Sequence, residues 1–130
     1  MILLDTNILI QYMKGLDSLV QRLQDASPRE VAIPSVVACE LEYGTLKTGS
    51  ARRRAMASGL LAKFTQVPFD REAASEAARI RVELERQGTV IGPMDLLIAG
   101  TATSRGAVLV TNNTGEFSRV KGLRLADWTR

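Results

Sequence analysis

MILLDTNILI, residues 1–10, is an apolar run interrupted by one acid, Asp5. Residues 1–4 have the length and composition of a buried strand, which would end where the acid begins. An ionised carboxylate is seldom fully buried unless another group pairs with it or coordinates it, because removing its water costs several kcal/mol or more. Asp5 is therefore expected either to cap the following helix or to hold a ligand.

The rest of the chain repeats this strand-then-helix arrangement. Short apolar segments at 1–4, 31–33, 65–68 and 107–110 alternate with stretches of helical periodicity. This alternation favours βα units and a parallel sheet that is covered on both faces. We expect a single domain, residues 1–130, that folds as an α/β protein: a three-layer α/β/α sandwich with a central parallel sheet of four or five strands.

The helices are predicted from their apolar stripes and end signals. One helix contains Leu19 and Leu23, and another is capped by Ser50 and contains Leu60. A longer helix follows Asp70, with a buried stripe that ends before Gly88 and consists of Ala73, Ala77, Ile80 and Leu84. Small residues in the helix after residue 92 are expected to let it approach a strand closely: Ala99, Gly100 and Ala102.

The composition limits which partners and which kinds of catalytic or metal site the chain can have. There are 17 Lys and Arg against 14 Asp and Glu, a net charge of +3 that permits a polyanionic partner without requiring one. The chain has no histidine, which excludes Ser-His-Asp and Cys-His catalysis and the common His/Cys zinc sites.

The single cysteine, Cys39, is expected to be a small core residue. With no apolar run near the ~20 residues of a membrane helix, we expect a soluble, cytoplasmic protein.

Polar residues follow two of the predicted strands. Asp5, Thr6 and Asn7 leave the first strand, and Thr111 and Asn113 leave the strand at 107–110. Because functional sites in parallel sheets form beyond the carboxyl ends of the strands, both groups are predicted to lie at the same edge of the sheet.

Two further acids lie in apolar surroundings. Glu40 shares the inward stripe of the helix after Pro34, whereas Glu42 lies about 200° around that helix and should be solvated. Asp95 is in the first turn of a helix that continues with apolar residues; complementing the helix dipole would explain an acid there, but not its apolar context. Like charges that lie close together raise one another's pKa unless a cation neutralises them. All-oxygen ligands suit Mg²⁺, with Mn²⁺ able to substitute.

Four segments in this order resemble the PIN-domain ribonuclease toxins of VapBC toxin–antitoxin systems: DTNILI (5–10), ELEYG (40–44), IGPMDLLIAGTA (91–102) and VLVTNNTGEF (108–117). The resemblance covers essentially the whole chain. It implies a metal-dependent endoribonuclease that a cognate VapB-type antitoxin neutralises. It carries the acidic catalytic set onto four residues of this sequence: Asp5, Glu40, Asp95 and Glu116.

Within that set, Asp5, Glu40 and Asp95 would hold the metal, and Glu40 would bind it directly or through water. Site-shaping residues would be Thr6, Asn7, Thr111 and Asn113, and whether Asn113 or Glu116 completes the metal site stays open. The resemblance also implies a homodimer, a larger assembly with the antitoxin, and an RNA substrate of the tRNA class.

Candidate contacts to the RNA backbone are basic residues in the middle of the chain, which would otherwise form a solvated helix face: Lys47, Arg52, Arg53, Arg54 and Lys63.

Two alternative functions compete with the nuclease hypothesis. A phosphotransfer or receiver domain also places Asp after its first strand, but the aspartyl-phosphatase pattern requires a second Asp at position 7, which is Asn. A catalytically silent PIN-like module that binds RNA or protein would have little reason to keep three unpaired acids in apolar surroundings.

Overall fold

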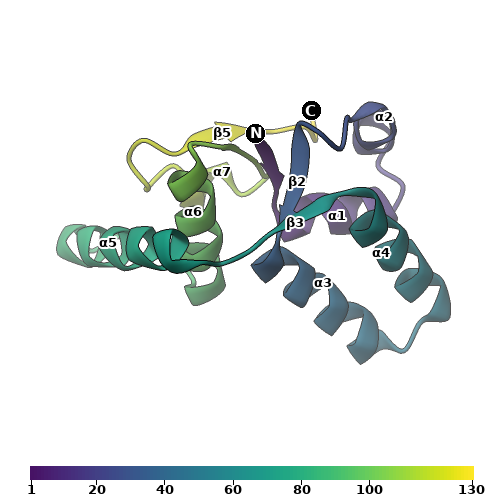
Figure 1. Ribbon diagram of the computed structural model, residues 1–130, viewed down its shortest axis with the longest axis horizontal. Coiled ribbons are helices and arrows are strands. Elements are labelled where there is room, and N and C mark those ends of the chain that lie inside the picture. The colour runs from purple at the N-terminus through teal and green to yellow at the C-terminus, as the bar shows by residue number, and fades with distance from the viewer.

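Five short parallel strands form the sheet in the computed structural model, which describes residues 1–130 (Figure 1). Their order across the sheet is β3-β2-β1-β4-β5. The strands are β1 (Ile2–Leu4), β2 (Val31–Pro34), β3 (Thr65–Val67), β4 (Val108–Val110) and β5 (Arg124–Ala126). The predicted parallel sheet is confirmed. The fifth strand is one that apolar patterning did not locate, because β5 lies at the edge and none of its three residues is fully buried.

The first ten residues lie at the centre of this sheet. β1 pairs with β2 on one side, Ile2 opposite Val31, and with β4 on the other, Ile2 opposite Val108. Leu3 and Leu4 are completely buried, as expected of a strand covered on both faces. The apolar part of the opening stretch is thus strand, and Asp5 is the first residue beyond it.

Helices cover both faces of the sheet (Figure 1). On one side lie α1 (Thr6–Met13), α2 (Asp17–Asp25), α3 (Ser35–Thr48) and α4 (Ala51–Lys63); on the other lie α5 (Arg71–Gln87), α6 (Pro93–Arg105) and the short α7 (Thr114–Phe117). The chain winds from β1 outward through β2 to β3, then crosses to β4 on the other side of β1. The winding direction therefore reverses between β1 and β4, where open α/β sheets usually bind their ligands.

The helix signals in the sequence correspond to observed contacts. Ser50 Oγ accepts a hydrogen bond from the Arg53 backbone N–H at 3.2 Å and caps α4, and Asp70 Oδ1 caps α5 by accepting from the Ala73 N–H at 3.0 Å. The predicted stripe of α5 is buried, and Gly88 ends that helix in the left-handed conformation. These ends are local in sequence, which is why they could be predicted.

One small residue of α6, Gly100, serves a purpose different from the expected one. A Cβ on Gly100 would lie 2.7 Å from the Ala73 carbonyl oxygen and 2.7 Å from the Ala77 Cβ. The close approach is therefore to helix α5, and the expectation that Gly100 lets α6 approach a strand was wrong. Gly100 of α6 faces Ala73 and Ala77 of α5 and brings the two backbones close together, a pairing that is visible only when both helices are known.

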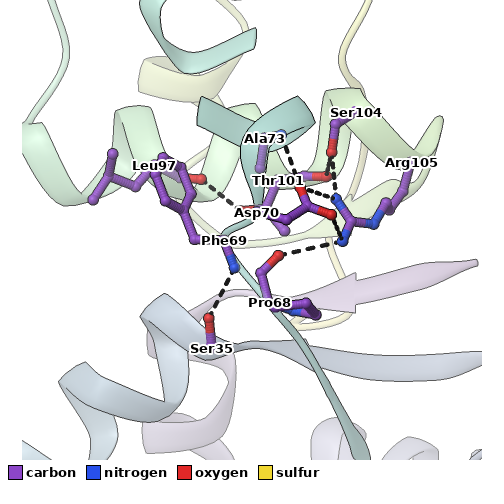
Figure 2. Close-up of polar contacts among 9 residues, drawn as sticks. All are labelled: Ser35, Pro68, Phe69, Asp70, Ala73, Leu97, Thr101, Ser104 and Arg105. Atoms are coloured by element: carbon purple, nitrogen blue, oxygen red, sulfur yellow. Dashed lines mark hydrogen bonds and ion pairs between the residues drawn. The ribbon is translucent and has the colours of Figure 1, made fainter. Parts of the chain in front are cut away.

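A polar cluster ties the start of α5 to the end of α6 (Figure 2). The Arg105 guanidinium donates to both carboxylate oxygens of Asp70, at 3.1 and 2.9 Å, and to the Pro68 carbonyl oxygen at 3.3 Å. Beside it, the Phe69 N–H donates to Ser35 Oγ at 3.2 Å and links the segment before α5 to α3. The cluster fixes the crossover from β3 to the far face of the sheet.

Cys39 is exposed, so the prediction that it is a core residue was wrong. It lies about 200° around α3 from the buried Val37, on the outward side. Glu42 is exposed as predicted. No helix combines the length and the apolar character that crossing a membrane demands.

Candidate active site

Polar residues from both central strands meet where the sheet reverses direction. Asp5 follows β1, and Thr111 and Asn113 follow the neighbouring β4. The Asp5 N–H donates to the Val110 carbonyl oxygen at 3.0 Å, which extends the ladder by one residue and fixes the two strand ends side by side. The prediction that these two groups share one edge of the sheet is confirmed.

Asp5 is buried, with 3% of its surface exposed, and both of its carboxylate oxygens accept hydrogen bonds. Its Oδ1 accepts from the Thr6 N–H at 2.9 Å and caps α1, and its Oδ2 accepts from the Thr111 hydroxyl at 2.8 Å. Burial raises the pKa of this carboxyl, and the two hydrogen bonds partly offset that rise by stabilising the ionised form. Because each carboxylate oxygen has two lone pairs, both retain acceptor capacity for a further ligand.

Glu40 reaches the site from helix α3, which begins directly after β2. The side chain is half-buried on the inward edge of the helix, as its position on the stripe predicted. Its Oε1 accepts from the Thr6 hydroxyl at 2.7 Å, so Thr6 connects Asp5 through its backbone to Glu40 through its side chain. No hydrogen bond of the protein uses Oε2, which remains free for a water molecule or a substrate group.

Asp95 comes from the first turn of α6, whose first residue is Pro93. Desolvation is the largest cause that raises the pKa of Asp95, to about 7, followed by the negative charge of Glu116 and then by that of Asp5. A position in the first turn of a helix would favour the ionised form. Burial and neighbouring acids therefore outweigh the helix dipole, and capping alone does not account for this residue.

Glu116 is held by donors on both of its oxygens. The Gly92 N–H donates to Oε1 at 2.9 Å, and the Asn113 side-chain amide donates to Oε2 at 2.7 Å. These two donors are the main reason that the pKa of Glu116 is lowered, so Glu116 is ionised beside a protonated Asp95 at mildly acidic pH. Asn113 is itself positioned by Thr111, whose hydroxyl oxygen accepts from the Asn113 N–H at 2.9 Å.

The structure thus brings all four predicted acids into one electrostatic unit. Asp5, Glu40 and Glu116 each raise the pKa of Asp95 through their charge. None of the four forms an ion pair with Lys or Arg; the ion pairs of the protein lie elsewhere. Four acids close together, one buried and three partly buried, are a costly arrangement without a cation, and an all-oxygen donor set of this kind suits a hard divalent cation.

The acids fit such an ion chemically but are not arranged as a complete ligand set. No group of three or more Asp, Glu, His or Cys side chains has the geometry of a metal site. Asp95 and Glu116 share a hydrogen bond instead, which holds the proton that a cation would displace. Side-chain rotation and loss of that proton would have to accompany binding, as is usual when metal and proton compete for carboxylates.

The remaining predicted residues lie around this centre. Asn7 is exposed in the first turn of α1 and contacts none of the four acids through a hydrogen bond. Exposed side chains on α3 and α4 carry the basic candidates Lys47, Arg52, Arg53 and Arg54. Lys63 points elsewhere: its Nζ donates to the Leu23 carbonyl oxygen at 2.7 Å and joins α4 to α2.

One contributor to the site was missed in the sequence, the backbone N–H of Gly92. A backbone donor has no residue-type signal, but the Gly-Pro pair that opens α6 marks the spot, since a helix N-terminus leaves its first N–H groups unpaired. The pairing with Glu116, 24 residues later, depends on how α7 packs. Phe117, buried completely, anchors that short helix.

Known proteins that are similar to this chain are nucleases of one family, in agreement with the cluster of acids. The PIN domain family matches residues 2–123. A tRNA(fMet)-specific endonuclease VapC from Shigella flexneri is 41% identical over 98% of this chain and 97% of its own length. The corresponding endonuclease of Salmonella typhimurium is 38% identical over 97% of this chain and 96% of its own length.

Solved structures agree in fold over the same length. VapBC from Salmonella typhimurium, bound to DNA, superposes with a TM-score of 0.89 at 38% identity and covers 98% of this chain and 97% of its own. VapBC2 from Rickettsia felis, bound to a promoter DNA fragment, gives a TM-score of 0.86 at 34% identity and covers 98% of this chain and 99% of its own. With the fold, the four clustered acids and full-length similarity all in agreement, the chain belongs to the PIN domain family.

Proposed function

We propose that this chain is the toxin of a VapBC-type pair: an endoribonuclease that hydrolyses phosphodiester bonds in RNA and is neutralised by a cognate antitoxin. The observation that carries the proposal is the uncompensated cluster of Asp5, Glu40, Asp95 and Glu116 at the reversal point of the sheet. Full-length similarity to tRNA(fMet)-specific endonucleases supports tRNA as the substrate class. The solved relatives are VapBC complexes, which supports an antitoxin partner.

PIN-domain ribonucleases depend on a metal ion, and we propose Mg²⁺, with Mn²⁺ able to replace it. Asp5 and Asp95 would hold the ion, and Glu40 would bind it directly or through water. A divalent cation at this place would lower the pKa of a bound water and neutralise charge on the phosphate.

The chain's own residues supply position and proton transfer. Glu40 Oε2, which no protein group occupies, can orient the attacking water and accept its proton. Thr6 fixes the Glu40 carboxylate through Oε1, and Thr111 fixes Asp5 through Oδ2. Asn113 and the Gly92 N–H keep Glu116 ionised beside Asp95. Holding the reacting groups in position before the reaction lowers the activation barrier and so contributes much of the rate enhancement.

Cleavage of purified total tRNA tests the proposal. The wild type is expected to cut in Mg²⁺ and not in EDTA, and Glu40→Gln should lower the cleavage rate by about 100-fold or more, the usual size of a lost general base. Glu42→Gln is the matched control, because Glu42 is on the same helix but exposed, and it should keep the wild-type rate.

Asp5→Asn and Asp95→Asn should also be inactive while remaining folded, since asparagine preserves the shape of each side chain and can still cap α1. Cleavage that persists in EDTA or in these variants would refute a metal site at the four acids. An inactive wild type that still binds tRNA would instead identify a binding module without catalysis.

A further inference from the structure

A groove of about 500 Å³ lies between helices α1, α3 and α4, beside the candidate active site. Its volume is within the range of pockets that bind ligands of nucleotide size. Twelve residues line it, and the only acid among them is Glu40. The groove therefore shares Glu40 with the candidate active site, and its other lining residues come from α1, from α3 and α4, and from the segment between these two helices.

Three cations line the groove beyond Glu40. They are Lys14, which ends α1, and Arg52 and Arg53 from the first turn of α4. None of them forms an ion pair, although five ion pairs exist elsewhere in the protein. Basic side chains in the first turn of a helix are also opposed by the helix dipole, so no local interaction accounts for Arg52 and Arg53 at this position.

Part of the groove lining is apolar. Ile10, Met13, Leu41 and Met56 line it, and Ile10 keeps 37% of its surface exposed. No aromatic side chain lines it, which excludes base stacking on a ring as the mode of recognition. A lining of apolar side chains and three cations suits a strand whose phosphates contact the cations while sugar and base edges contact the aliphatic side chains.

We propose that this groove holds the RNA strand on one side of the scissile bond, with its phosphates at Lys14, Arg52 and Arg53. The inference rests on the proposed function for the position of the scissile phosphate at the acids. It rests on the groove itself for the path of the strand, because Glu40 lines the groove and is also one of the four acids.

The groove also divides the basic residues of the hairpin. Arg54 lines a separate, smaller hollow between α3 and α4, and the Lys47 ammonium lies 5.8 Å from the centre of the Tyr43 ring. Arg52 and Arg53 are therefore the residues of the hairpin that contact the strand. Lys14 joins them in the groove although it lies far from them in the sequence, so clustering of basic residues along the chain does not reveal it. Arg54 and Lys47 are expected to contribute less.

Binding is measured apart from cleavage, by fluorescence anisotropy with a labelled 12-nucleotide single-stranded RNA of mixed sequence, in EDTA and in an Asp95→Asn background. Lys14→Ala and Arg53→Ala should each raise Kd about fivefold, and each should reduce the slope of log Kd against log salt by about 0.7, the value for one lost phosphate contact on a single strand. Arg86→Ala is the control: Arg86 is exposed in the last turn of α5, forms no ion pair and lies outside the groove, so Kd and slope should not change.

A second variant tests the groove without changing charge. Gly44 lines the groove, and a Cβ added there would meet no atom within 4 Å, so Gly44→Leu should extend a side chain into the groove and raise Kd. Gly59→Leu, at an exposed position of α4 with equally free surroundings, should bind as the parent does. Melting temperatures of both variants show whether they are folded.

The outcomes separate the two proposals. Unchanged Kd and salt slope in the Lys14, Arg53 and Gly44 variants would overturn the groove as the strand path, even if the wild type cleaves tRNA in Mg²⁺. The same result combined with loss of a co-purifying antitoxin would assign the groove to that protein. Weakened RNA binding by these variants, from a wild type that never cleaves, would support the groove and refute the nuclease.

Discussion

Asp95 carries the most altered acid-base chemistry among the single residues of this protein. Its carboxyl shares a hydrogen bond with Glu116, and burial together with three neighbouring acids raises its pKa to about 7. An unfolded chain would release this proton near pH ~4. Asp95 therefore couples folding to pH, and a cation that replaces the proton would remove this coupling.

In EDTA, we expect the free energy of unfolding to fall as the pH rises from about 4 to about 7. Over this range the folded state keeps a proton on Asp95 that the unfolded state has lost, so each step up in pH favours unfolding. Urea denaturation at several pH values measures the slope, and Asp95→Asn should have a shallower one. Equal slopes in the two proteins would show that Asp95 titrates normally.

At the scale of elements, α5 and α6 form the tightest helix pair, and Gly100 is the reason. The backbone of α5 occupies the place that a Cβ on Gly100 would need, with the Ala77 N at 2.8 Å. The first turn of α6 carries Asp95, so the packing of this pair also sets where that carboxylate lies relative to the sheet.

Gly100→Ala should destabilise the protein by about 1–3 kcal/mol, because the helices must separate to admit a methyl group against backbone atoms. Gly59→Ala, in a helix position where a Cβ meets nothing within 4 Å, should instead stabilise by about 0.5–1 kcal/mol through helix propensity. Chemical denaturation of both variants gives the comparison. A Gly100→Ala protein as stable as the wild type would mean that the helices can move apart without cost.

The cluster of Asp70 and Arg105 joins the same two helices at the start of α5 and the end of α6 (Figure 2). Asp70→Asn should lower the melting temperature at neutral pH because it removes an ion pair while preserving a capping side chain. Hydrogen bonds from the Ala73 N–H and from Arg105 lower the pKa of Asp70, so its stabilising effect is present above the ordinary pKa and is lost as the pH falls through the lowered one. A melting-temperature difference between wild type and variant that does not shrink in strong acid would contradict this assignment.

At the scale of the whole molecule, the sheet order brings together acids that are up to 111 positions apart in the chain, from Asp5 to Glu116. The reversal between β1 and β4 places two strand ends side by side, and helices α3 and α6 approach that point from opposite faces (Figure 1). The mutual repulsion of the acids lowers the stability of the folded state, and a bound cation would offset that loss.

Mn²⁺ should therefore raise the melting temperature of the wild type, by an amount that grows with the logarithm of its concentration. Asp95→Asn should gain less, because one of the proposed ligands is missing and the repulsion is already reduced. Differential scanning fluorimetry across a Mn²⁺ series, with Glu42→Gln as a control for surface charge, makes the measurement. Equal gains in all three proteins would place the ion outside the shared site.

The sequence by itself determined the strand and helix alternation, the cap at Ser50, the start of a helix after Asp70, and the inward position of Glu40. Each of these depends on residues within one or two turns of one another, so periodicity and end signals suffice to predict them. The family resemblance carried by four short segments added the identity of the acids, which spacing alone left open between capping and ligand binding.

Only the tertiary structure decided which elements meet. It paired Gly100 with helix α5, turned Cys39 to solvent, placed the edge strand β5, and gave Glu116 the Gly92 N–H as a donor. It also separated Arg52 and Arg53 from Arg54 by opening a groove on one side of α4. These features depend on contacts between distant segments, for which a single sequence has no local signal, because packing and charge act between surfaces that exist only after the chain has folded.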